Sequence, residues 1–339
     1  MKLVQFGDVH LDAPLEKFTA QTARLLRARA RELVSRAVDL AANQGADAIL
    51  CTGDLFDSPR PYLDSVRYVR DQFAKTDIPV FISPGNHDPF TPSSPWAAVN
   101  WPGNVHIFSS PHGERLVLPG FSLTGWANTA QRQSHAPLEG AWEKSDILLF
   151  HGEIAEDSPY FHASQAQITA SGAGLLAMGH IHGHFTKTLG RTLVSMNGGL
   201  QATKFGETGQ KGAVIISLDP GEAKADLVPL GGTRCFELAF SDGEFPDLSA
   251  LCPFPPGDTL LDLTLTGAPL TPREELSVKT EGFLQVRITD LRRAPRELPT
   301  GKSLGALFLR RAAETELSLL ATEFGLAALE NREQPHAEE

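Results

Sequence analysis

The sequence opens with KLVQFGDVH, residues 2–10, and later runs through AILCTGDLFD, residues 48–57. Residues 2–6 and 48–52 are short, mainly apolar runs that end at a Gly-Asp pair, which is typical of buried strands. Between them an apolar stripe recurs at helical spacing: Phe18, Leu25, Leu26, Leu33, Val34, Ala37 and Ala41. A strand, a long helix and a second strand form the βαβ pattern, so this stretch predicts a layered α/β domain.

Further short apolar runs, each ending at Gly, Pro, Asn or Asp, continue the pattern along the chain. They predict strands at residues 79–83, 105–108, 147–150, 175–178, 193–196 and 213–218. The pattern changes near residue 233. After that point the sequence predicts strands at 235–240, 260–265 and 283–289, a helix around 271–280, and helix again over 303–330. A large α/β part is therefore followed by a small α+β unit and a helical segment.

The composition is typical of a soluble globular protein, with 41% hydrophobic and 21% charged residues among 339. No apolar run reaches the roughly 18 residues of a membrane span. The start, MKLVQFGDVH, leaves no room for a secretory leader, and the three cysteines show no CxxC spacing. We therefore expect a cytoplasmic protein without disulfides or a zinc–thiolate site.

Charge is distributed unevenly along the chain. The net charge of −11 argues against an autonomous nucleic-acid binder, which is usually basic. Residues 17–36 nevertheless carry six basic side chains against one acidic one: Lys17, Arg24, Arg27, Arg29, Arg31 and Arg36. A second basic stretch contains Arg287, Arg292, Arg293, Arg296 and Lys302. Each stretch could contact phosphates or simply form a solvated face.

Five of the predicted strands lead directly into polar motifs. The motifs are GDVH at 7–10, GDLFD at 53–57, PGNHD at 84–88, HGE at 151–153 and GHIHGH at 179–184. In α/β sheets, ligands bind at the edge where the carboxyl ends of the strands meet. Asp8 and His10 are two residues apart, as are His180 and His182, so on an extended chain each pair points to one side.

Seven residues of these motifs are of metal-ligand type: Asp8, His10, Asp54, Asn86, His151, His180 and His182. A mixture of carboxylate, amide and imidazole donors suits Mn, Fe or Zn better than Ca or Mg. Two divalent ions would outweigh the charge of Asp8 and Asp54, so the centre would attract and polarise an anionic ester. The sequence therefore predicts a two-metal phosphoesterase.

Together the five motifs resemble those of the calcineurin-like metallophosphoesterases, over residues 1–218. HLDAPL, GDLFDSPRP and NGGLQATKFGETGQKG resemble in particular the DNA repair exonucleases of that family, such as the nuclease subunit of the bacterial SbcCD complex. The resemblance implies an α/β fold with a layered β-sandwich flanked by helices in residues 1–232. It also implies a small α+β capping domain in 233–300, and a C-terminal helix with an acidic tail in 301–339.

The resemblance further implies how the ligands are shared. One ion would be held by Asp8, His10 and His182, the other by Asn86, His151 and His180, with Asp54 bridging. The ions, expected to be Mn²⁺ with Fe or Zn as alternatives, would activate a bridging hydroxide for attack on phosphorus. His87 and Asp57 are the expected catalytic residues: His87 would protonate the leaving oxygen, oriented by Asp57 or Asp88. A helix cap is the alternative role for Asp57.

Four further residues are candidates for substrate contacts: His184, Lys204, Arg292 and Arg293. A surface imidazole and an exposed lysine are the competing interpretations of His184 and Lys204. The resemblance implies DNA as substrate, an SbcC-like SMC-family ATPase docked by the C-terminal helix, and a homodimer formed through residues 61–73. The alternatives are a small phosphodiester or phosphomonoester as substrate, a C-terminal helix packed on its own domain, and a core role for residues 61–73.

Overall fold

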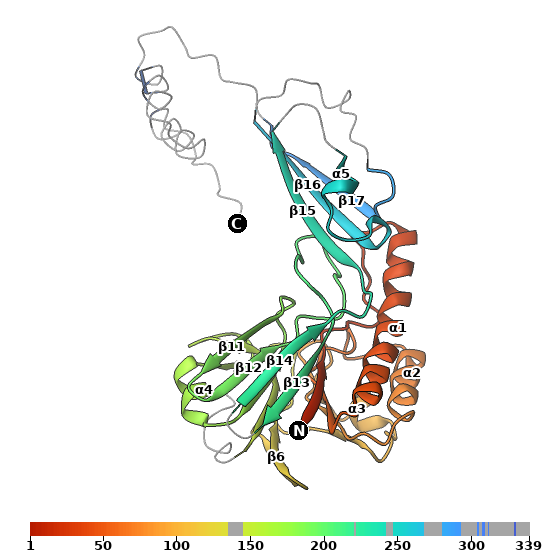
Figure 1. Cartoon of the computed structure of the whole chain (residues 1–339), viewed down its shortest axis with the longest axis vertical. Helices are drawn as coiled ribbons and strands as arrows, with labels where there is room; N and C mark the ends of the chain where they lie inside the picture. Colours follow the sequence, from red (N-terminus) through yellow and green to blue (C-terminus); the bar gives the residue numbers. More distant parts are fainter. Residues whose placement is uncertain are drawn as a thin grey trace. The chain divides into compact units, whose positions relative to one another are not determined.

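The computed structural model describes residues 1–134, 145–219, 222–241, 247–267 and 280–292, together with Leu304, Leu307, Phe308, Arg311 and Leu329. Two six-stranded sheets form most of it (Figure 1). The first has the order β14 (Glu222–Val228), β13 (Ala213–Asp219), β1 (Lys2–Phe6), β2 (Ala48–Cys51), β3 (Val80–Ile82), β4 (Val105–Ile107). The second has the order β11 (Phe185–Leu189), β12 (Thr192–Met196), β10 (Leu175–Gly179), β7 (Ile147–His151), β6 (Phe121–Gly125), β5 (Glu114–Leu118).

Parallel pairing forms the middle of each sheet. In the first, β1 to β4 are parallel, and in the second, β6, β7, β10 and β12 are parallel. The antiparallel strands β13, β14, β5 and β11 extend the two sheets outward. Since parallel strands end at the same edge, the loops that follow β1, β2 and β3 lie together, as do those that follow β7 and β10.

The two sheets pack face to face. Leu3 and Leu50 from the first sheet share a buried cluster with Leu149 and Ala177 from the second. Gln5 also crosses this interior, where its side-chain amide donates to the carbonyl oxygens of Met178 and Ser195 at 2.9 Å each. The bonds join β1 to β10 and β12, which fixes the relative position of the loops that follow these strands.

Helices cover the outer faces of the sandwich. Val4 and Phe6 alternate with Leu3 along β1, and they pack with α1 (Ala20–Gln44) and α2 (Leu63–Phe73). On the second sheet, Ile168 of α4 (Gln165–Ser171) packs against residues of β7 and β10. The predicted β-sandwich flanked by helices is thereby confirmed.

Helix α1 contains most of the predicted apolar stripe and has a capped start. The Thr19 hydroxyl oxygen accepts from the backbone N–H of Thr22, and Gly45 ends the helix at φ 58°. The predicted apolar stripe is wrong at Phe18, which precedes the helix, and at Leu25, which is 36% exposed because its neighbour Leu26 takes the buried position. In α2 the residues Val66, Val69 and Phe73 are buried in the core of the same chain. This agrees, for these three residues, with the core role that was the alternative to a dimer contact.

A third sheet contains β15 (Arg234–Ser241), β16 (Thr259–Thr266) and β17 (Gln285–Asp290), close to the predicted strands. The remaining short elements are α3 (Pro95–Ala98), α5 (Leu248–Leu251), η1 (Pro256–Asp258), β8 (Glu153–Ile154) and β9 (His162–Ala163). Contacts group most of the third sheet with the sandwich in one compact unit. The helix predicted around 271–280 and most of the one predicted over 303–330 lie outside the described residues. None of the helices described is long and apolar enough to cross a membrane.

Candidate metal centre

The predicted ligands lie in loops at the carboxyl ends of the parallel strands of both sheets. Four of them have a left-handed backbone, which side chains other than glycine rarely adopt: Asp8 (φ 49°), His10 (φ 50°), Asp54 (φ 48°) and His180 (φ 100°). Such a conformation costs about 1–3 kcal/mol per residue and persists only where the surroundings impose it. The backbone is therefore strained at four positions, and the strained conformation directs these four side chains toward the candidate metal centre.

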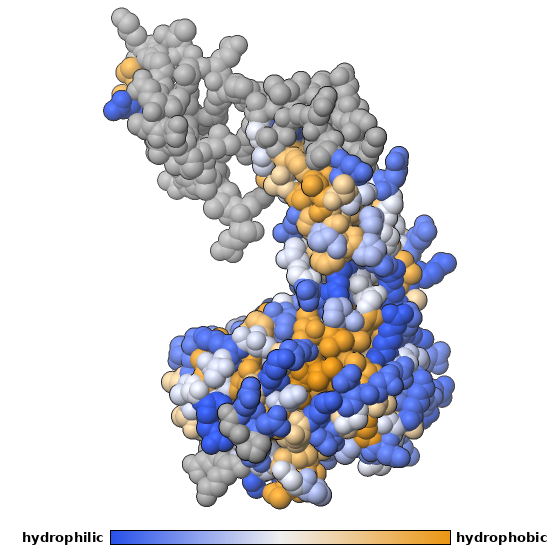
Figure 2. Space-filling model, in the orientation of Figure 1, coloured by the Kyte–Doolittle hydropathy of each residue, from blue (hydrophilic) through white to orange (hydrophobic). Residues whose placement is uncertain are grey.

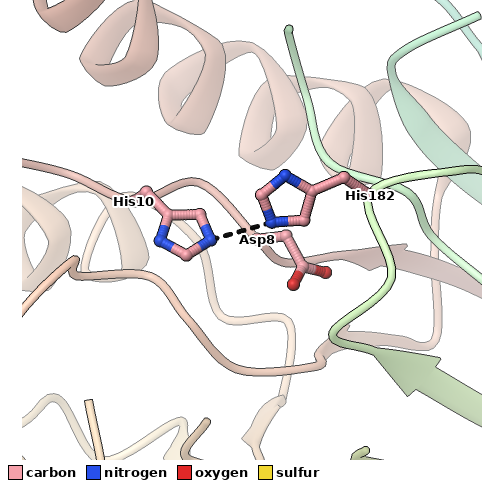
Figure 3. A group of neighbouring side chains, drawn as sticks. All are labelled: Asp8, His10 and His182. Atoms are coloured by element: carbon pink, nitrogen blue, oxygen red, sulfur yellow. Dashed lines mark hydrogen bonds between the residues drawn. The ribbon is translucent and has the colours of Figure 1, made fainter. Parts of the chain in front are cut away.

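The first group of ligands comprises Asp8, His10 and His182. Figure 3 shows the two imidazole rings facing each other with the Asp8 carboxylate beside them. The Nε2 atoms of His10 and His182 are 3.0 Å apart, and one donor atom from each residue lies within 4.8 Å of the others. Two ring nitrogens this close need a cation or a shared proton between them, so the group suits a metal ion.

The second group comprises Asn86, His151 and His180. Asn86 Oδ1 lies 2.9 Å from His151 Nε2 and 2.9 Å from His180 Nδ1, and the two nitrogens are 3.3 Å apart. Asp54 Oδ2 lies 3.2 Å from His151 Nε2 and 3.8 Å from His10 Nε2, and so stands between the two groups. All seven predicted ligands are thus brought together, with Asp54 in the position expected of a bridge.

The other ring nitrogen of each histidine meets an oxygen atom. The four contacts are His10 Nδ1 to Asp57 Oδ1 (2.9 Å), His151 Nδ1 to Thr52 O (2.8 Å), His180 Nε2 to Glu153 Oε1 (3.1 Å) and His182 Nδ1 to Glu207 Oε1. An acceptor at one nitrogen keeps the proton there and leaves the lone pair of the other nitrogen for a metal. The donor set therefore fits two divalent ions.

Charge in the centre also favours cations. Burial disfavours a charged His10, but the hydrogen bond to Asp57 and the charges of Asp54 and Asp8 outweigh burial and raise its pKa to about 9. Burial of His151 is likewise outweighed, chiefly by the charge of Asp54, and its pKa also rises to about 9. The same interactions lower the pKa of Asp54 despite its burial. Protons and metal ions would therefore compete for these groups.

Two buried residues hold the ligand loops in place. Asn197 donates from Nδ2 to Asp8 Oδ2 at 2.9 Å. The Asp88 carboxylate, which is 1% exposed, accepts from the backbone N–H groups of Asp54 (3.2 Å), Phe56 (3.1 Å) and Gly85 (2.8 Å). Asp88 was one of two residues expected to orient His87, and this alternative is wrong, because both oxygens of the Asp88 carboxylate are engaged by these backbone groups.

His87 lies at the side of the centre with its side chain 43% exposed. Its backbone N–H donates to Asp54 Oδ1 at 2.8 Å, and its Nδ1 is 3.3 Å from the carbonyl oxygen of Asp57. Asp57 Oδ1 is 2.9 Å from His10 Nδ1 but 3.5 Å from His87 Nδ1. The Asp57 carboxylate therefore forms its hydrogen bond with His10 and is farther from His87. His87 and several ligands line a cavity of about 630 Å³, together with Leu15, Phe18 and Tyr160.

The four candidate substrate contacts have different surroundings. His184 Nδ1 lies 2.7 Å from the carbonyl oxygen of Met196, a contact that anchors the loop after β10. Lys204 lines the cavity and is 64% exposed, with Nζ 3.6 Å from Glu207 Oε1. The guanidinium of Arg292 forms hydrogen bonds of 2.9 Å to Asp290. Arg293 lies outside the described residues. Substrate binding by these residues stays a prediction.

Hydrophilic residues cover the outer side of α1 (Figure 2), but most of its arginines are engaged within the chain. Arg27 donates to the carbonyl oxygen of Pro14, Arg29 pairs with Asp258, Arg31 donates to Ser65 Oγ, and Arg36 pairs with Glu32. In the second basic stretch, Arg287 pairs with Asp262. Much of the positive charge noted in the sequence therefore has a partner in the fold.

Sequence reasoning assigned no role to three residues next to the ligands: Glu153, Glu207 and the buried Lys211. Glu153 ends the quoted HGE motif, so its position next to a ligand was a usable signal. Glu207 and Lys211 follow His182 by many residues in a glycine-rich loop, and no spacing relates them to it. Only the tertiary structure brings them to the centre.

The model of the calcineurin-like phosphoesterase family matches residues 1–184, more than half of the chain. This chain therefore belongs to the calcineurin-like phosphoesterases, and its geometry is that of a metal-dependent phosphoester hydrolase.

Among individual relatives, the uncharacterized metallophosphoesterase YhaO of Bacillus subtilis is 26% identical over 299 residues, covering 80% of this chain and 71% of that protein. The DNA double-strand break repair protein Mre11 of Thermoplasma acidophilum is 25% identical over 223 residues, which is 58% of each chain. The match thus spans less than two thirds of that protein. A solved structure, TT1561 of Thermus thermophilus, aligns with 67% of this chain and 98% of its own, at 15% identity and a TM-score of 0.40.

Proposed function

We propose that this phosphoesterase is a DNA nuclease that hydrolyses phosphodiester bonds at a two-metal centre in DNA repair. The observation that supports hydrolysis is the convergence of seven donor groups, with Asp54 between the other six. In each ligand histidine the second ring nitrogen contacts an oxygen atom. The choice of DNA is supported by the similarity to the repair protein Mre11 and by the sequence motifs shared with DNA repair exonucleases.

The residues divide the chemical work between them. Asp8, His10 and His182 would hold one divalent ion, and Asn86, His151 and His180 the other, with Asp54 shared. Such ions polarise the phosphoryl oxygens and supply a nucleophile at neutral pH. The Nδ1–H of His87 faces the Asp57 carbonyl oxygen, which leaves Nε2 as the nitrogen that can act on the leaving oxygen. The added water oxygen ends on phosphorus, and the leaving oxygen takes up a proton.

The partners and the metal belong to the same proposal. We expect Mn²⁺ as the ion, an SbcC-like SMC-family ATPase as the partner and a homodimer as the working state. The test is a nuclease assay with Mn²⁺, on the chain alone and with its ATPase, using linear, nicked and hairpin DNA. Loss of cleavage in His87→Ala, with Mn²⁺ binding retained, is the expected result. Absence of cleavage of every DNA form, even with the ATPase, would contradict DNA as substrate.

A small phosphodiester or phosphomonoester is the second candidate substrate. Two observations favour it: the net charge of −11, and the engagement of Arg29, Arg31 and Arg287 by other residues of the chain. Both reduce the positive surface available to a DNA backbone. Hydrolysis of cyclic or dinucleotide substrates at ordinary enzymatic rates, with DNA left intact, would select this function.

A further inference from the structure

Glu207 is the outer partner of one metal-ligand histidine. Its side chain is 4% exposed, and its Oε1 accepts the hydrogen bond from Nδ1 of His182. Its other oxygen, Oε2, accepts from the backbone N–H of Thr203 at 2.7 Å and from the Thr203 hydroxyl at 3.3 Å. A carboxylate fixed at both oxygens offers His182 an acceptor in one defined place.

Lys211, four residues further on, holds the backbone of the same histidine. It is 1% exposed, and its ammonium group donates to the carbonyl oxygen of His182 and, at 3.1 Å, to that of Gly198. Burying a lysine is costly unless its protons are taken up by acceptors, and these two carbonyl groups are such acceptors. Residues 203–211 therefore hold both the ring and the main chain of His182.

The loop of residues 203–211 packs against the third sheet through Phe205. Phe205 is 9% exposed and belongs to a buried cluster with Cys235 of β15 and Leu260 of β16. The guanidinium carbon of Arg287, from β17, lies 4.8 Å from the centre of the Phe205 ring. Arg287 is itself held by Asp262 of β16, with Nε to Oδ1 at 2.8 Å. Movement of this sheet would therefore displace the loop.

We propose that Glu207 is a positioning residue that keeps the proton of His182 on Nδ1 and aims Nε2 at the ion held by Asp8 and His10, and that the third sheet holds Glu207 in place. The inference rests on the two-metal centre of the proposed function, and it does not depend on DNA being the substrate. Loss of an outer-shell carboxylate typically weakens metal binding about 10- to 100-fold. Only one of the two ions should be affected.

Calorimetric titration of the metal-free protein with Mn²⁺ tests this. We expect one of two binding steps to weaken about 10- to 100-fold in Glu207→Gln and Glu207→Ala, while the other stays within about twofold. Glu153→Gln is the matched change at His180 and should weaken the other step. Glu237→Gln is the control. The Glu237 carboxylate lies near the loop that carries Glu207, since its Oε1 would be 3.8 Å from a Cβ atom placed on Gly206. Glu237 is exposed and forms no hydrogen bond with His182.

Two further measurements separate positioning from general destabilisation. In the Zn²⁺-loaded protein, the NMR signal of the His182 Nδ1 proton should be shifted far downfield, and should lose that shift in Glu207→Ala. In a His182→Ala background, Glu207→Gln should cost no further Mn²⁺ affinity, because Glu207 would act only through that ring. If Glu207→Ala does not fold, the nearly isosteric Glu207→Gln carries the test.

The part played by the third sheet is tested with Phe205→Ala, which should weaken the same Mn²⁺ step as Glu207→Gln and leave the other unchanged. Unchanged Mn²⁺ binding in both Glu207 variants would overturn the inference, as would an equal loss of both steps. An unchanged titration in Phe205→Ala would overturn the role of the sheet alone. A wild-type protein that binds Mn²⁺ in two steps but cleaves no DNA would contradict the proposed substrate and leave this inference standing.

Discussion

Replacement of Asp88 should show how much its carboxylate contributes to the stability of the ligand loops. Its buried carboxylate accepts three backbone N–H groups, from Asp54, Phe56 and Gly85, at 2.8–3.2 Å. An unsatisfied buried donor costs about 1–3 kcal/mol. Asp88→Ala leaves all three donors without their acceptor, so we expect a loss of about 3–6 kcal/mol in the free energy of unfolding, allowing for partial relief by water. Asp88→Asn keeps one acceptor oxygen and should lose about 1–3 kcal/mol.

Urea denaturation of the metal-free protein, followed by circular dichroism, measures these losses. Typical domains are stable by about 5–15 kcal/mol, so Asp88→Ala should unfold at a much lower urea concentration. Asp64→Ala is the matched control, because the Asp64 side chain is 84% exposed and forms a 3.8 Å surface ion pair with Arg67, an interaction that contributes little to stability. A loss in Asp88→Ala no greater than in Asp64→Ala would refute the reasoning.

Three further predictions concern metal binding. Burial opposes a charged His10 or His151, but neighbouring carboxylates raise the pKa of each to about 9. Since the ions must displace these protons, Mn²⁺ affinity should rise with pH between about 6 and 9, and binding should release protons. Calorimetry in buffers of different ionisation enthalpy measures the number of protons released. Gly85→Ala places a carbon 2.1 Å from Asp54 Oδ1 and should abolish binding of at least one ion, whereas Gly103→Ala, with open space around it, should bind as wild type. Chelation with EDTA should lower both the melting temperature and the hydrolytic activity, and added Mn²⁺ should restore both, while a melting temperature unmoved by either treatment would contradict a metal centre within the fold.

The surroundings of His87 show which of its two expected partners, Asp57 and Asp88, lies near its side chain. The motif GNHD predicted a histidine beside the centre, and His87 does line the cavity. The sequence neighbour Asp88 is turned away from it, toward the backbone of the Gly53–Asp54 loop. Asp57 stands between two histidines and is nearer to His10. Adjacency in sequence says little about which way side chains point in a tight loop, because the backbone reverses direction within one or two residues.

The strands that precede the ligands and the ligand series could be read from the sequence by itself. The apolar runs in β2 and β3 are continuous, and the run in β1 is interrupted only by Gln5, because both sheet faces are buried. A polar motif follows each of these strands. Since parallel strands of one sheet share an edge, ligands placed after β1 and β2 must meet, and Asp8 and Asp54 do; the packing of the two sheets adds His151 to them. The long helix α1 could also be predicted from the sequence, because its apolar stripe matches the helical period.

Only the tertiary structure decided which other residues support these ligands. The strands β5, β11 and β14 carry exposed side chains and lack a continuous apolar run, so no pattern identified them. Glu207 reaches His182, and Asp258 reaches Arg29, across stretches of chain that no spacing rule relates. Local sequence specifies what a strand or helix buries, because that depends on its own period. The partners of a buried charge depend on how separate segments pack, and that is known only once the sheets, helices and loops have come together.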